Sequence, residues 1–154
     1  MSDARWQDIE SDVASSVAHF SSAIRIYREP GLHADSPDGY MRRMAFMHAM
    51  YAGHTSMERA LLRILELQGE EAPSGRQWHA DLVARVGSNV GDRPAVLSTT
   101  LVKAADRTRK FRHVTAHTYD NFDPDDADPA VRAAEKLAAG LLAAFAAYRA
   151  AIDP

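Results

Sequence analysis

Hydrophobic residues recur about every three or four positions along most of the chain, which is the spacing of one face of an α-helix. No convincing alternation of apolar and polar residues predicts a β-sheet. The first apolar stripe consists of Trp6, Ile9, Val13, Val17, Phe20, Ile24 and Tyr27. We therefore expect a first helix over residues 4–28, ended by Pro30 and Gly31.

A long second helix is expected from Ser36 to about residue 68. Ser36 suits the N-cap and Pro37 the first helical position, while Gly69 and Pro73 favour a stop. The apolar side of this helix contains Met44, Met47, Tyr51, Leu61, Leu62 and Leu65. A short third helix, closed by Gly87, carries Trp78, Leu82, Val83 and Val86.

Two further helices complete the pattern. The fourth is expected to begin near Asp92, Arg93 and Pro94 and to reach about residue 118, with an inward face of Leu97, Leu101, Ala104, Phe111 and Val114. Asp128 is the expected N-cap of the fifth, whose buried stripe is Val131, Leu137, Leu141, Phe145, Tyr148 and Ile152. The sequence thus predicts one all-α domain over residues 1–154, an up-and-down bundle of four main helices plus one short helix.

Composition narrows the class of protein. A chain of 154 residues is long enough to bury a core of its own. It contains no cysteine, which excludes disulfides, zinc–thiolate sites and a cysteine nucleophile. The first residues lack the apolar segment of a signal peptide, and the longest apolar stretch, 137–148, is shorter than the roughly 18 to 20 residues that span a bilayer. We therefore expect a cytoplasmic protein without a membrane partner.

Charge is unevenly distributed. The net charge of −3 argues against a nonspecific nucleic-acid coat protein. Residues 103–112 nevertheless hold five basic residues and one acidic residue, and five aspartates follow between 120 and 128. Two interpretations stay open: a solvated helix face followed by an acidic loop, or an RNA-binding surface that uses Arg107, Arg109 and Lys110. Charge alone favours the first.

The pair Arg-x4-His occurs three times, as Arg28–His33, Arg43–His48 and Arg112–His117. Such pairs arise easily by chance in a chain with 7 histidines and many arginines, so the pair alone indicates nothing. Only the third pair is followed by x-Tyr, which adds Tyr119, and only the third lies in the basic stretch at a helix end. That context makes it the candidate site.

These residues match the needs of metal-independent RNA cleavage, which are a base for the 2′-hydroxyl, a cation for the phosphorane and an acid for the 5′-oxygen. His117 can fill either proton role near neutral pH, and Arg112 offers a planar fork of donors to phosphate oxygens. His113 either carries the second proton or orients His117. On an ideal helix Arg112 and His117 diverge by about 140°, so a two-fold dimer is expected to bring them into one cleft.

The run Arg112-His113-Val114-Thr115-Ala116-His117-Thr118-Tyr119, with Trp78-His79-Ala80-Asp81-Leu82 upstream, resembles the R-x4-H-x-Y motif of the HepT branch of the HEPN superfamily. This resemblance implies an all-α ribonuclease toxin that needs no cofactor. It also implies a homodimeric active site with Arg112 and His117 as catalytic residues, and adenylylation of Tyr119 by a nucleotidyltransferase (MNT-type) antitoxin. The family commonly has Asn or Asp after the arginine, where this chain has His113.

Three functions stay open on the sequence alone. The first is the metal-independent endoribonuclease toxin, acting on RNA. The second is a catalytically inactive HEPN subunit that binds a nucleotide or a protein. The third is a metal-binding bundle in which His113 and His117 are joined by Asp120 or Asp123, although HxxxH alone is a weak signal. Among the other histidines, His48 and His54 are expected in core or interface packing and His79 in the contact of the short helix.

Overall fold

The computed structural model describes residues 4–118 and 122–153, the side chains of 116–118 excepted. Its elements in chain order are α1 (Ala4–Arg28), α2 (Pro37–Leu67), α3 (Trp78–Val86), α4 (Thr99–Thr118), the 3₁₀ helix η2 (Pro124–Ala127) and α5 (Asp128–Ile152). Within these residues, β-type pairing is limited to one isolated bridge between Val90 and Arg93. The all-α class predicted from the sequence is confirmed.

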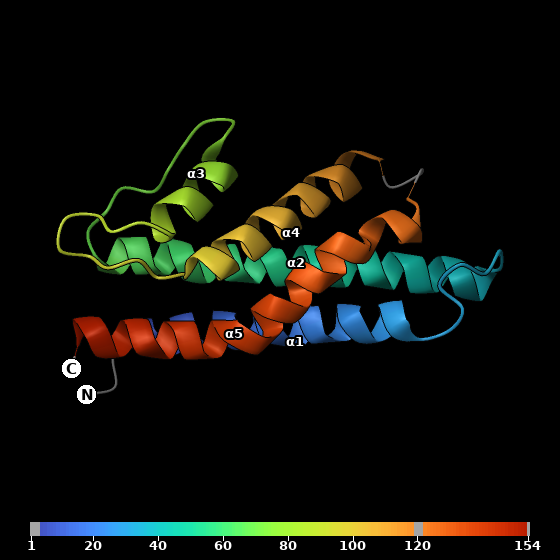
Figure 1. Ribbon diagram of the computed structural model, residues 1–154, viewed down its shortest axis with the longest axis horizontal. Coiled ribbons are helices and arrows are strands. Elements are labelled where there is room, and N and C mark those ends of the chain that lie inside the picture. Colours follow the sequence, from blue (N-terminus) through green and yellow to red (C-terminus); the bar gives the residue numbers. More distant parts are fainter. Residues whose placement is uncertain (1–3, 119–121, 154) are drawn as a thin grey trace.

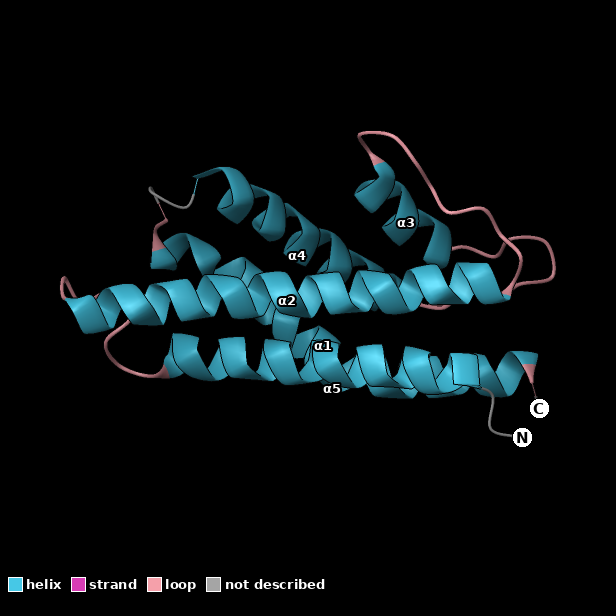
Figure 2. Ribbon diagram, turned by 180° about the vertical axis from the view of Figure 1, so that it is seen from behind, coloured by secondary structure: helices cyan, strands magenta, loops and turns pink. Residues whose placement is uncertain are grey.

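α2 runs through the middle of the molecule (Figure 1), with α1 on one side of it and α3 and α4 on the other. α5 crosses α2 and packs against both α4 and α1. The long helices alternate in direction, so the start of α1 and the end of α5 lie at the same end of the bundle. Figure 2 shows that the two long loops that flank α3 also lie at one end. This is the up-and-down arrangement expected from the sequence.

Local chemistry explains where α2 begins and how closely it packs. The Ser36 side chain accepts a hydrogen bond from the Gly39 amide at 3.1 Å, and Pro37 follows at the first helical position. In the middle of α2, a Cβ on Gly53 would lie 2.7 Å from the ring of Phe20 on α1. The glycine therefore allows α1 and α2 to approach each other closely. At the same place Ser16 of α1 donates a hydrogen bond to the Gly53 carbonyl at 2.6 Å.

The predicted start of the fourth helix near residues 92–94 is wrong, because α4 begins at Thr99. Val90 and Arg93 exchange backbone hydrogen bonds, which holds the chain in a turn. The buried Arg93 side chain also binds Glu70, in the loop just after the end of α2. The helix can begin only after these contacts, where the Ser98 hydroxyl accepts from the Leu101 amide at 3.3 Å.

Two smaller expectations are also wrong. Asp128 is the first residue of α5 and not its cap; Ala127 is at the N-cap, and Asp123 instead caps the preceding 3₁₀ helix through the amide of Asp125. Val114 was expected to face inward, yet its side chain is 53% exposed. In Figure 1 the end of α4 rises away from α2, so the apolar stripe of α4 loses its neighbour in the last turns. None of the helices in the described ranges is both long and apolar enough to cross a membrane.

Candidate functional site

A groove of about 430 Å³ lies between the start of α3 and the neighbouring face of α4. Its described lining holds three arginines, two histidines and no acidic side chain: Arg76, Gln77, His79, Ala80, Arg109, Arg112 and His113. The lining is therefore positively charged at neutral pH. Such a surface attracts anions, above all a polyanion such as a nucleic-acid backbone.

Arg112 is held at the edge of this groove by α2. Its guanidinium carbon lies 4.7 Å from the centre of the Tyr51 ring, and its nitrogens lie 3.4 Å from the hydroxyls of Tyr51 and Thr55. A cation over an aromatic face is attracted without losing its charge, and hydrogen bonds of this length are weak. Among the described residues no carboxylate pairs with Arg112, and its contacts with Tyr51 and Thr55 leave its positive charge in place.

The contact with Arg112 also corrects an expectation about Tyr51. The sequence placed Tyr51 on the apolar side of α2, but its side chain is 40% exposed. Tyr51 and Thr55 are one turn apart on α2, and together they form the surface that the guanidinium contacts. The sequence does not predict this contact, because Thr55 and Tyr51 belong to a different helix and precede Arg112 by 57 and 61 residues.

The other members of the predicted motif are only partly placed. His113 is exposed and lines the groove beside Arg112. His117 belongs to the last turn of α4, one turn after His113, but its side chain lies outside the described part of the structure. Tyr119 lies outside the described residues altogether. The catalytic roles of Arg112, His117 and His113 and the modification of Tyr119 thus stay predictions.

Of the three cations predicted to bind RNA, only Arg109 lines the groove. Asp106 binds Arg109 at 2.7 Å and Lys110 at 3.2 Å. Burial raises the pKa of Asp106, but hydrogen bonds and charge from Arg109 and Lys110 outweigh burial and bring this pKa below its usual value. Both cations are therefore partly neutralised within α4 itself.

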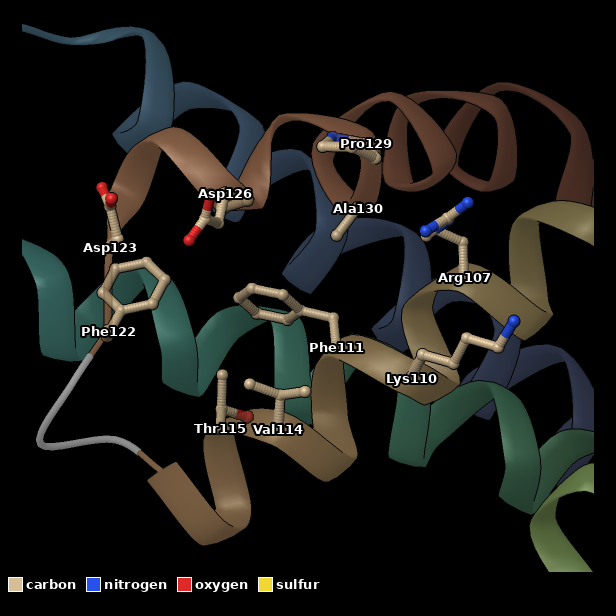
Figure 3. Close-up of a pocket in the computed structure, with 11 residues that line it drawn as sticks. Arg107, Lys110, Phe111, Val114, Thr115, Phe122, Asp123, Asp126, Pro129 and Ala130 are labelled. Atoms are coloured by element: carbon tan, nitrogen blue, oxygen red, sulfur yellow. The ribbon is translucent and has the colours of Figure 1, made fainter.

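Arg107 and Lys110 face a second cavity, on the opposite side of α4 (Figure 3). This pocket has a volume of about 250 Å³ and is lined by Arg107, Lys110, Phe111, Val114, Thr115, Phe122, Asp123, Asp126, Ala127, Pro129 and Ala130. The rings of Phe111 and Phe122 meet edge to face, with their centres 6.1 Å apart. The structure thus divides the predicted RNA-binding cations between two surfaces.

Behind the groove lies a buried acidic residue that the sequence analysis did not single out. The side chain of Glu58 is 4% exposed, and its Oε2 lies 2.5 Å from Nδ1 of His79 and 3.3 Å from Nε2 of His54. His54 in turn lies 2.8 Å from the hydroxyl of Thr108 through Nδ1. Burial raises the pKa of Glu58, but the hydrogen bonds and charges of His54 and His79 outweigh burial and leave this pKa below the usual value.

The structure also shows where the other three histidines considered in the sequence analysis lie. His54 is fully buried, as expected from core packing, whereas His48 is exposed on α2. His79 belongs to the contact of the short helix, as predicted, and its ring stacks on Trp78 with the centres 3.6 Å apart. The signal that could have found Glu58 is its place four residues after His54 on an otherwise apolar face.

The metal set considered from the sequence lies partly outside the described residues. His113 and Asp123 are described, but the side chain of His117 and all of Asp120 lie outside the described residues. Among the side chains that are described, no group of three or more histidine, aspartate or glutamate residues is arranged to hold a metal ion.

Comparison with known proteins identifies the family. A search of curated proteins and a search of solved structures each found no match. A family model described as HepT-like protein matches residues 45–152, which covers most of α2 and everything from α3 to the end of α5. The match includes the groove, the Arg112 motif and the buried Glu58. Because it extends over more than half of the chain, the protein belongs to the HepT-like family of the HEPN superfamily.

Proposed function

We propose that this protein is a metal-independent endoribonuclease toxin of the cytoplasm, paired with a nucleotidyltransferase antitoxin. Membership of the HepT-like family supports the class. The observation that carries the proposal is the guanidinium of Arg112, which lies at a basic groove in contact with the neutral side chains of Tyr51 and Thr55. A guanidinium that no described carboxylate neutralises, beside an anion-attracting groove, is suited to a phosphodiester.

The proposed reaction is an internal transesterification. The ribose 2′-oxygen attacks phosphorus, the bond to the 5′-oxygen breaks, and the products carry a 2′,3′-cyclic phosphate and a 5′-hydroxyl. Arg112 stabilises the charge that develops on the phosphorane oxygens, which is the electrostatic role that a metal fills elsewhere. His117 transfers a proton, and His113, beside Arg112 in the groove, assists it or orients it.

We further propose that the working unit is a homodimer. Arg112 and His117 diverge around the axis of α4, so one helix by itself does not aim both at the same phosphate. Tyr51, whose ring lies against the Arg112 guanidinium, is a large side chain that is 40% exposed. Two-fold pairing through this region would cover Tyr51 and bring Arg112 of one subunit toward His117 of the other.

The RNA strand and the antitoxin would both act at the surface around Arg112. Arg109 extends the contact within the groove, and Arg107 and Lys110 would contact the strand where it leaves α4 on the other side. Adenylylation of Tyr119, just beyond the end of α4, would add a phosphate and a nucleoside near Arg112 and compete with RNA for that cation.

The test is cleavage of total tRNA and of a labelled single-stranded RNA in excess EDTA. We expect the wild-type protein to cleave and the Arg112→Ala and His117→Ala variants to lose activity by a factor of about 10² to 10⁴ while circular dichroism stays unchanged. Arg25→Ala is the matched control, because Arg25 is an exposed arginine on α1. Full activity in either variant of the pair would overturn the proposal, as would cleavage that EDTA abolishes.

Subunit mixing tests the dimeric site. If Arg112 and His117 act across the interface, a mixed dimer of Arg112→Ala and His117→Ala contains one intact site and one doubly altered site. Equal co-expression should then restore about one quarter of the wild-type activity, because half of the dimers are mixed and half of their sites are intact. No restoration would place the pair within one subunit.

A further inference from the structure

We propose that His79 is a further catalytic residue, the general base of the RNA cleavage, and that buried Glu58 holds its ring in position. The inference rests on the proposed nuclease function and deepens it. It starts from geometry: Glu58 lies behind the groove, His79 lines the groove, and the two are joined by a contact of 2.5 Å between Oε2 and Nδ1.

Glu58 is unusual because it is an acidic side chain in the core. A buried carboxylate is stable only when hydrogen-bonded or paired with positive charge. The partners of Glu58 are His54, one turn earlier on α2, and His79, near the start of α3. Since His79 comes from the short helix that forms one wall of the groove, the carboxylate connects the core to the surface where RNA is proposed to bind.

The protons that face Glu58 can be assigned from the contacts of this cluster. The Thr108 hydroxyl lies 3.1 Å from the carbonyl of Ala105 and 2.8 Å from Nδ1 of His54, and its single proton can be donated to either. Nε2 of His54 faces Oε2 of Glu58 at 3.3 Å, without the alignment of a hydrogen bond to any described residue. A lone pair on this nitrogen would be repelled by the carboxylate, so we assign a proton to it, and this N–H of His54 points at Glu58.

This assignment allows His79 to act as a base in its neutral form. The carboxylate of Glu58 receives one N–H from His54 and one from His79, so it stays hydrogen-bonded when His79 is neutral. Its Nδ1–H donates to Glu58, and Nε2, on the other edge of the ring, keeps a lone pair. The side chain is 26% exposed and lines the groove together with Arg112, so this second edge is the one a ligand can reach.

The proton transfers balance as follows. Nε2 of His79 takes the proton of the 2′-hydroxyl as the oxygen bonds to phosphorus, and the imidazolium that forms is stabilised by Glu58. The P–O5′ bond breaks, and protonated His117 gives its proton to the departing oxygen. One histidine gains the proton that the other loses in the overall reaction, and Arg112 neutralises the phosphorane between the two transfers.

The competing interpretation is that Glu58 and His79 only tie α3 to α2. The His79→Asn variant separates the two, because the Asn side-chain NH₂ can take the place of Nδ1–H and keep the bond to Glu58 but has no basic nitrogen. A structural tie predicts near-normal cleavage by His79→Asn, whereas a catalytic base predicts a loss by a factor of about 10² to 10⁴ in kcat. His33→Asn, at an exposed histidine on the α1–α2 loop, is the matched control.

Two further measurements show whether His79 acts as the general base or as the general acid. In the pH profile of kcat/KM, His79→Asn should lose the acidic limb that reports the free base. The charged or titratable groups near His79 that could influence this limb are Glu58, His54, Arg76, Arg109, Arg112 and His113. The second measurement uses an RNA whose bridging 5′-oxygen is replaced by sulfur, a leaving group that departs without being protonated. A variant that lacks the general acid then regains its cleavage rate, whereas a variant that lacks the general base does not. We expect His117→Ala to recover and His79→Asn to stay slow.

The outcomes separate this inference from the proposed function. If Arg112→Ala and His117→Ala are inactive but His79→Asn is active, His79 is a structural residue and only this inference fails. If His79→Asn recovers on the sulfur substrate, His79 is an acid and not the base. A wild-type protein that cleaves no RNA would overturn both proposals together.

Discussion

The two sides of α4 carry similar numbers of cations and yet differ in what surrounds them. On the side facing α3, Arg109 and Arg112 line a groove without acidic side chains among its described residues. On the side facing the start of α5, Arg107 and Lys110 share a pocket with Asp123 and Asp126. The first surface has a net positive charge and the second is nearly balanced.

The sign of the charge on each surface depends more on the side chains that neighbouring elements contribute than on the helix that supplies the cations. Counting residues 103–112 as one basic segment combines two surfaces with different ligand preferences. A phosphodiester is expected to prefer the groove, where the potential is positive. The pocket, with two phenylalanine rings and both signs of charge, is a poorer site for a polyanion.

Removing one arginine from each side of α4 should have the largest effect. Arg112→Ala should lower kcat/KM for RNA by a factor of about 10³, because it removes the cation that faces the phosphorane. Arg107→Ala should lower it only a few-fold, since it removes a contact outside the reacting centre. Steady-state cleavage of one labelled RNA measures both. Equal losses would mean that the two sides of α4 act as one surface.

A second contrast concerns stability. Glu58→Gln removes the charge opposite His54 in the core and should lower the free energy of unfolding by about 3 kcal/mol. Asp126→Asn, at the edge of the pocket, should change it by less than about 0.5 kcal/mol. Urea denaturation followed by circular dichroism measures both. A stable Glu58→Gln protein would show that the groove does not depend on buried charge behind it.

Low pH should reduce the difference in unfolding free energy between the wild-type protein and Glu58→Gln. The pKa of Glu58 is lowered in the folded protein from its ordinary 4.5, so its stabilising contribution is complete above that pH and is lost as pH falls through the folded pKa. The gap in unfolding free energy between wild type and Glu58→Gln should therefore be widest near neutral pH and should narrow below about pH 4.5. A gap that stays constant down to about pH 3 would contradict the charged form of Glu58.

The smallest expected effect is at Asp106, which lies between the two sides and neutralises Arg109 and Lys110. Asp106→Asn should tighten RNA binding by a factor of about two to five at low salt, and the gain should shrink as salt screens the exposed charges. Filter binding at two salt concentrations checks this. Weaker binding by the variant would indicate that Asp106 orients the cations and does not merely neutralise them.

Periodicity predicted most of the fold because the apolar stripes of α1 and α2 are long and their ends carry Ser36, Pro37 and Gly69. The start of α4 could not be predicted, since the turn before it depends on a contact between Arg93 and Glu70 that only the tertiary structure creates. Sequence patterns contain the local capping chemistry but not the distant partner that overrides it.

The candidate site, like the fold, was predictable only where it depends on the spacing of residues within one helix. Positions three and four apart on a helix share a face, which explains why Arg109, Arg112 and His113 line one groove, whereas the sequence analysis had grouped Arg109 with Arg107 and Lys110. The same rule would have assigned Arg107 and Lys110 to the other side. Glu58 and His79 were not connected, because the bond between them joins residues 21 positions apart in the chain.

The stacking of Trp78 on His79 gives the protein an internal optical probe. An indole in contact with an imidazole is quenched more strongly when the imidazole carries a proton, so the fluorescence of Trp78 should follow the charge of its neighbour. The other tryptophan, Trp6, lies 6.5 Å from Tyr148 at the far end of α5 and can be replaced by Phe to leave a single emitter. The emission of that variant would then report ligand entry and proton uptake in real time, without an added label.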